Sequence, residues 1–177
     1  MAEKQAKIEV RVRELAQLFN SIDPSPFLDR DLDADAEEFI VGWAREFPKT
    51  SELELTVHLA APAPADRAQG LEAAVRHYFG MRAGMKQREF RVLMRRGWQS
   101  LVIGLLFLGG CMVLGGIVAG LLSGTAAEVM REGLTICGWV AMWRPLEIYL
   151  YGWWPLREEQ RLFARLARMR VQLVLPS

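Results

Sequence analysis

The chain has 177 residues, a net charge of +1, two cysteines and two histidines. Its length leaves room for one small soluble domain beside a membrane part, and the balanced charge gives no general attraction to nucleic acid. Cys111 and Cys137 both lie in apolar stretches and are expected to pack rather than to form a disulfide framework. Neither histidine has a cysteine at ligand spacing, so we expect no zinc site, and because no cofactor motif is present we expect no cofactor.

Two stretches near the N-terminus alternate between apolar and polar residues. Lys7–Arg13 places its β-branched residues on one face and its charged residues on the other. Ser51–Leu59 alternates in the same way, with leucine and valine at every second position. Alternation of this kind is typical of half-buried strands, so we predict a strand in each stretch.

The acidic segment between these strands is predicted to contain a helix. Asp35 and Glu38 have the spacing of a capping box, which is a better interpretation of the alternating aspartates than a calcium loop. Pro48 is expected to end the helix. The apolar residues at helical spacing, which predict its buried face, are Phe39, Ile40, Trp43 and Phe47.

A stiff linker, Ala60–Ala65 with two prolines, is expected to lead into a second amphipathic helix, Asp66–Phe79. Gly80 and Gly84 are expected to interrupt that helix, which then resumes as a basic amphipathic neck near Met85. The residues predicted to face inward before the interruption are Leu71, Ala74, Val75, Tyr78 and Phe79.

The longest apolar stretch, Gly97–Ala127, has 31 residues and no charge. A hydrocarbon layer of about 30 Å needs about 20 apolar helical residues, so we predict a transmembrane helix here. Gly116, Gly120 and Gly124 form a double GxxxG pattern that favours close helix packing. The pattern fits packing against a second span of the same chain or association of several copies.

A second, less apolar span is predicted at Leu134–Trp154, with Arg144, Pro145 and Glu147 near its midpoint. A charged residue costs about 3 kcal/mol at the centre of a span, so this span should need a partner helix or an ion pair. Three interpretations stay open for the polar group: a structural ion pair, an element for conduction or proton relay, and a contact with lipid or a partner.

After the second span we predict a basic amphipathic helix, Leu156–Arg170. The pattern of Val171–Leu175 is compatible with a third short strand, and whether this segment joins the N-terminal sheet stays open. The apolar face of the helix is expected to contain Leu162, Phe163, Leu166 and Met169.

Positive charge flanks both spans on the same side. By the positive-inside rule, this charge pattern predicts that both termini lie in the cytoplasm. We therefore expect a protein of the inner membrane with two spans. The residues predicted to bind anionic lipid headgroups are Arg88, Arg91, Arg95, Arg96, Arg157, Arg161 and Arg165. Those predicted to form an interfacial aromatic belt are Trp98, Trp153 and Trp154.

The segment WRPLEIYLYGWWPLR, which follows an acidic PSPF-x-x-RDLD-x-x-AEEF segment, resembles small uncharacterised bacterial inner-membrane proteins. The resemblance implies the architecture with two spans and no assigned activity, and it supplies no catalytic residue.

The expected fold is a small cytoplasmic α+β domain of two or three strands plus an α-helical transmembrane hairpin. We divide the chain into the domain (1–80), the neck (81–97), the hairpin (98–154) and a cytoplasmic C-terminal part (155–177). The favoured function is a non-enzymatic interaction or regulatory module for a partner protein or lipid. The alternatives are a homo-oligomeric channel with Arg144 and Glu147 near the bilayer midplane, and a membrane enzyme, for which no recognisable motif is present.

Overall fold

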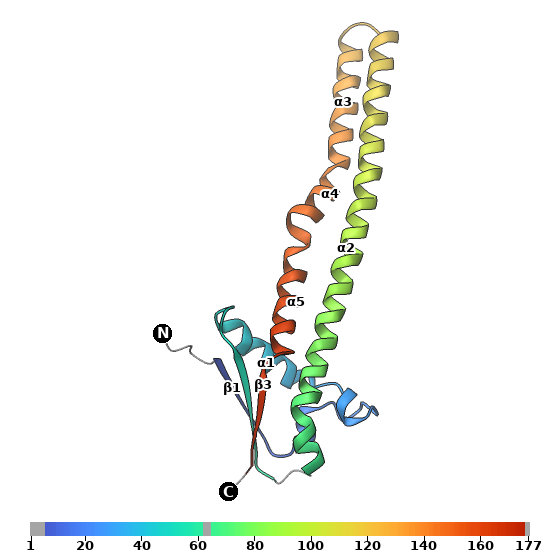
Figure 1. Cartoon of the computed structure of the whole chain (residues 1–177). Helices are drawn as coiled ribbons and strands as arrows, with labels where there is room; N and C mark the ends of the chain where they lie inside the picture. The colour runs from blue at the N-terminus through green and yellow to red at the C-terminus, as the bar shows by residue number, and fades with distance from the viewer. Residues whose placement is uncertain (1–5, 62–64, 176–177) are drawn as a thin grey trace. The chain divides into compact units, whose positions relative to one another are not determined.

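The computed structural model describes residues 6–61 and 65–175 and has a mixed α/β fold with a small sheet and a long apolar helix (Figure 1). It divides into two compact units, one made of the residues up to Lys86 and from Glu158 on, the other of Gln87–Arg157. The predicted linker prolines, Pro62 and Pro64, lie outside the described residues. The elements are β1 (Ala6–Val12), α1 (Ala34–Glu46), β2 (Leu53–Leu59), α2 (Ala65–Leu121), α3 (Thr125–Ala141), α4 (Trp143–Glu147), a π-helical turn (Ile148–Gly152), α5 (Trp154–Leu166) and β3 (Arg170–Val174).

The sheet has three parallel strands in the order β1-β2-β3. Leu55 at the centre of β2 is paired with Ile8 of β1 on one side and Val171 of β3 on the other. The two predicted strands are therefore confirmed, and the C-terminal segment, whose pairing the sequence left open, forms the third strand of the same sheet.

One face of the sheet carries the core of the first unit. Ile8, Leu55 and Val57 are fully buried there, against apolar residues of α1, of the first turns of α2 and of α5. Lys7 and Glu9, on the opposite face of β1, are exposed. Connections between parallel strands are nearly always right-handed. Two such connections that add strands in the same direction across the sheet therefore place their helices on the same face of the sheet. This topology explains why only one face of a parallel sheet is covered here, where both usually are.

Helix α1 differs from its prediction at its start and in its buried face. Asp33, not Asp35, is the N-cap, and its carboxylate accepts a hydrogen bond from the backbone N–H of Asp35. Phe39 and Trp43 were expected to be buried, but each is 45% exposed. The residues that α1 buries are Ile40, Val41 and Ala44. This stripe of aliphatic residues faces the sheet, and the aromatic rings lie to one side of it.

Helix α2 confirms the predicted inward residues and contradicts the predicted interruption. Leu71, Val75 and Phe79 are among the most buried side chains of the first unit. The helix then continues through Gly80 and Gly84 without a break. A helical glycine costs about 1 kcal/mol relative to alanine. The burial of Phe79 on one side of these glycines and the partial burial of Ala83 between them offset that cost.

The predicted second span is not one straight helix. The α3 helix ends at Ala141, one turn before Pro145, and helical structure resumes in α4. Proline has no N–H to donate to the carbonyl four residues earlier, which accounts for the break. The final helix, α5, stops at Leu166, four residues earlier than predicted, because Arg170 already belongs to β3. Its predicted inward residues are all buried, namely Leu162, Phe163, Leu166 and Met169.

Candidate functional site

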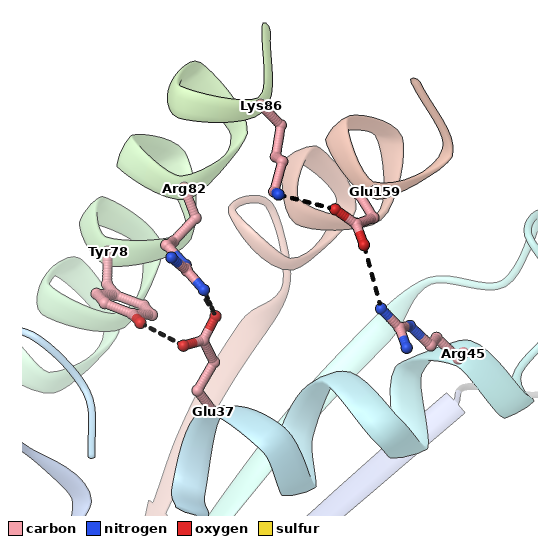
Figure 2. Close-up of polar contacts among 6 residues, drawn as sticks. All are labelled: Glu37, Arg45, Tyr78, Arg82, Lys86 and Glu159. Carbon is pink, nitrogen blue, oxygen red and sulfur yellow. Dashed lines mark hydrogen bonds and ion pairs between the residues drawn. The ribbon is translucent and has the colours of Figure 1, made fainter. Parts of the chain in front are cut away.

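In the first unit, α1, α2 and α5 are joined by a cluster of ion pairs. Glu37 of α1 lies at the centre of one half of the cluster (Figure 2). Its carboxylate accepts a hydrogen bond of 2.7 Å from the Tyr78 hydroxyl and one of 2.8 Å from Nε of Arg82. Burial, supported by the bond to Glu37, raises the pKa of Tyr78, so the phenol keeps the proton that it donates.

Glu159 of α5 lies at the centre of the other half. Its two carboxylate oxygens contact Lys86 of α2 at 3.0 Å and Arg45 of α1 at 3.8 Å (Figure 2). A shallow groove of about 360 Å³ runs between the three helices, and Phe163 forms part of its wall. The groove is lined by as many acidic as basic side chains: Glu37, Glu38 and Glu159 against Arg45, Arg82 and Lys86.

The geometry of this cluster is that of a structural clamp. The guanidinium of Arg82 lies 5.5 Å from the centre of the Phe163 ring, so α2 contacts α5 as well as α1. The positive charges of Arg82 and Lys86 are balanced by carboxylates, which leaves no net charge to attract an ionic ligand. Among the described residues, no group of three or more His, Cys, Asp or Glu side chains is placed to hold a metal ion.

This cluster was not predicted from the sequence. Arg82 and Lys86 belong to the segment predicted as a basic neck (81–97), and Glu37 belongs to the segment predicted as an acidic helix. One signal was present: Tyr78, Arg82 and Lys86 follow each other at intervals of four residues and therefore share a face of α2. Their acidic partners lie on helices far away in sequence, and only the tertiary structure identifies them.

The residues predicted to bind lipid headgroups fall into three groups. Arg165 does not fit the prediction, because its guanidinium donates to the backbone carbonyls of Pro48 and Ser51, at 2.9 and 3.0 Å. Arg157 is exposed, and its guanidinium lies over the rings of Phe90 and Trp153. The others are exposed and form no ion pair with any described residue: Arg88, Arg91, Arg95, Arg96 and Arg161.

The second unit contains two antiparallel helical arms whose glycines fix their register. A Cβ added to Gly138 of α3 would lie 2.6 Å from Cδ1 of Leu108, and one added to Gly104 of α2 would lie 3.1 Å from Sδ of Met142. The arms are therefore in close contact at these two positions. Gly116 and Gly120 have no atom near enough to touch an added Cβ, so the predicted packing of this GxxxG pattern against the second arm is not found. Gly124 lies beyond the end of α2 with a positive φ, in a turn rather than on a helix face.

The described part of the chain contains one helix, α2, that is long and apolar enough to cross a membrane. Most of its apolar side chains beyond Gly97 are exposed, among them Ile103, Leu106 and Leu121. Of the predicted belt residues, Trp98 and Trp154 are exposed. Trp153 is half-buried, and its indole N–H donates to the carbonyl of Tyr149.

Arg144 and Glu147 form the ion pair that the sequence analysis considered, with 2.9 Å between Nη1 and Oε2. The two side chains are 72% and 52% exposed, while Pro145 between them is buried. Ile148 lies against Gly97 and Met142 lies against Gly104. The ion pair is therefore level with the first turns of the apolar part of α2 and not with its middle.

We compared the chain with protein-family models, curated proteins and solved structures, and no significant match was found in any of the three.

Proposed function

We propose that the chain is an integral protein of a bacterial inner membrane, with two spans and with both termini in the cytoplasm. Its α+β domain acts as a non-enzymatic binding or regulatory module next to the bilayer. The membrane partner is lipid with anionic headgroups, which the exposed arginines between Arg88 and Arg96 attract at about 1 kcal/mol per residue.

The observation that carries this proposal is the pairing of β3 with β2. The chain leaves the sheet through α2 and returns to it through α5. Two neighbouring strands of one sheet must lie on the same side of a membrane. If α2 crosses the bilayer, the chain must cross it again before α5, so the number of spans is even. The segment available for the return is α3 with α4, which already lies against α2.

The register of the arms supports an anchoring role for the hairpin rather than a channel. Arg144 and Glu147 lie level with the segment Gly97–Gly104, next to the basic neck. At such a depth a charged pair reaches headgroups and water, where its cost is far smaller than at the midplane. The channel alternative needs these charges in the middle of the bilayer, and the contacts of the hairpin give no support to that position.

Cysteine labelling tests the proposed topology. In full-length protein with Cys111→Ser and Cys137→Ser, a single cysteine is introduced either at Glu14, an exposed residue of the domain, or at Ser123, between α2 and α3. With a maleimide that does not cross membranes, we expect intact bacterial cells to label position 123 and to label position 14 only after permeabilisation. Labelling of position 14 in intact cells, or of neither position before permeabilisation, would contradict two spans with cytoplasmic termini.

A further inference from the structure

Helix α1 has two aromatic side chains, Phe39 and Trp43, that the core of the first unit does not bury. Their ring centres are 6.2 Å apart, and the ring centre of Phe47, which follows the last helical residue and packs partly against the core, is 6.5 Å from that of Trp43. Phe39 and Trp43 are each 45% exposed. None of the three lines the groove between α1, α2 and α5. At 1.5 Å per residue the exposed pair Phe39 and Trp43 extends over about 6 Å of the helix, which matches about one turn of a partner helix.

Acidic side chains accompany these rings. Asp35, Glu38 and Glu46 are exposed on the same helix and form no ion pair with any described residue, and Glu38 lies at the side of the helix that also lines the groove. An aromatic face bordered by unpaired carboxylates is complementary to cationic side chains, which gain from the carboxylates and from the faces of the rings. The same carboxylates oppose contact with an anionic membrane surface, because that surface has the same sign of charge.

We propose that the acidic aromatic face of α1, formed by Asp35, Glu38, Phe39, Trp43 and Glu46, is the docking site for a cationic amphipathic helix of a different protein. The partner helix would place apolar side chains on Phe39 and Trp43 and lysine or arginine beside the carboxylates. This inference rests on the proposed function, because it names the surface and the class of partner of the cytoplasmic module. Exposed tryptophan is a frequent centre of binding energy in such contacts.

Site-specific photo-crosslinking in the source membranes tests the proposal with the full-length chain. Trp43 is replaced by p-benzoylphenylalanine, and the cross-linked peptides are identified by mass spectrometry. The same substitution at Ile22, an 88% exposed apolar residue in the loop before α1, is the control position. We expect an adduct at position 43, absent at position 22, with a segment of another protein that is rich in lysine or arginine.

Charge variants test whether the carboxylates recognise the partner. Glu38→Gln with Glu46→Gln should lower the yield of this adduct at least fivefold. Glu14→Gln with Glu52→Gln, which removes the same charge from exposed positions elsewhere in the domain, should leave the yield unchanged. Raising the salt concentration should also lower the yield, because exposed charges are screened.

Four results would overturn the proposal: no adduct at position 43, an adduct only with lipid, an adduct only with a second copy of this chain, or a yield that the Glu38 and Glu46 substitutions do not change. Each of these can occur while positions 14 and 123 are labelled as the two-span topology requires. Failure of the docking site is therefore distinguishable from failure of the membrane topology.

Discussion

At the scale of single residues, the carboxylate of Glu37 connects α1 to α2 because it accepts hydrogen bonds from two side chains of α2. The Tyr78 hydroxyl and the Arg82 guanidinium share its carboxylate, and the side chain of Glu37 is only 17% exposed. We expect Glu37→Ala to lower the free energy of unfolding by about 1–3 kcal/mol, because it leaves a phenol and a partly buried cation without their acceptor. Thermal unfolding of the full-length protein in detergent would measure this loss.

The adjacent residue provides the matched control for Glu37. The side chain of Glu38 is exposed and forms no hydrogen bond or ion pair with a described residue, so Glu38→Gln should change the unfolding temperature little. Glu37→Gln should fall between the two, since the amide still accepts one hydrogen bond but no longer balances the charge of Arg82. Equal unfolding temperatures for Glu37→Ala and Glu38→Gln would contradict the role that we assign to the cluster.

At the scale of elements, the spacing of apolar residues predicted the buried face correctly for each helix or strand that has only one apolar face. The strands and the inward sides of α2 and α5 follow from spacing alone, because each has a single apolar face. Helix α1 has two adjacent apolar faces, and the aromatic one is the larger. The sheet selected the aliphatic face with Ile40 and Ala44, and spacing within one helix cannot predict that choice. The clamp around Glu37 depends on three helices at once, and the expected interruption at Gly80 separated Tyr78 from Arg82, so the order of residues did not predict the clamp.

The contact between α2 and α3 depends on the absence of a side chain at Gly138. A Cβ there would lie 2.6 Å from a methyl carbon of Leu108 and 3.3 Å from its Cα, so the two helices would have to separate. We expect Gly138→Val to expose Cys111, which is buried at the same level of the hairpin. The rate at which a maleimide labels Cys111 in a Cys137→Ser background would report the change.

Gly133 is the matched control for this substitution. It belongs to the same helix, and an added Cβ would meet nothing within 4 Å. In the Gly133→Val variant, the maleimide should therefore label Cys111 as slowly as it does in the parent protein. If both valine variants accelerate labelling to the same extent, the effect belongs to the residue type and not to the contact with Leu108.

At the scale of the whole molecule, the second parallel connection of the sheet contains the entire hairpin. A connection between parallel strands normally consists of one helix and short loops. Here it runs from β2 through α2, the second unit and α5 to β3. The order of residues left open whether the last strand returns to the domain, and both this return and the continuous passage of α2 into the apolar segment followed only from the structure. The domain and the hairpin are therefore topologically nested, and the domain is complete only after the chain has come back.

This nesting predicts that the domain folds without the hairpin if its two segments are joined. Lys86 and Glu159 contact each other at 3.0 Å, so the two cut ends lie close together within the first unit. A flexible linker of six Gly and Ser residues has a mean span of about 13 Å and can replace residues 87–157. We expect this variant to stay in solution without detergent and to protect the backbone amides of β2 from hydrogen exchange.

The control is a chain that ends at Lys86. It keeps β1, α1 and β2 but lacks α5 and β3, and with them the buried side chains of Phe163, Leu166 and Met169. Loss of these side chains exposes apolar surface of the sheet and of α2, so the truncated chain should aggregate or exchange its β2 amides at the rate of an unfolded chain. Equal protection of β2 in the linked and the truncated chains would show that the domain does not need its C-terminal segment. The argument for an even number of membrane crossings would then lose its basis, because that argument requires β3 to be an integral strand of the sheet.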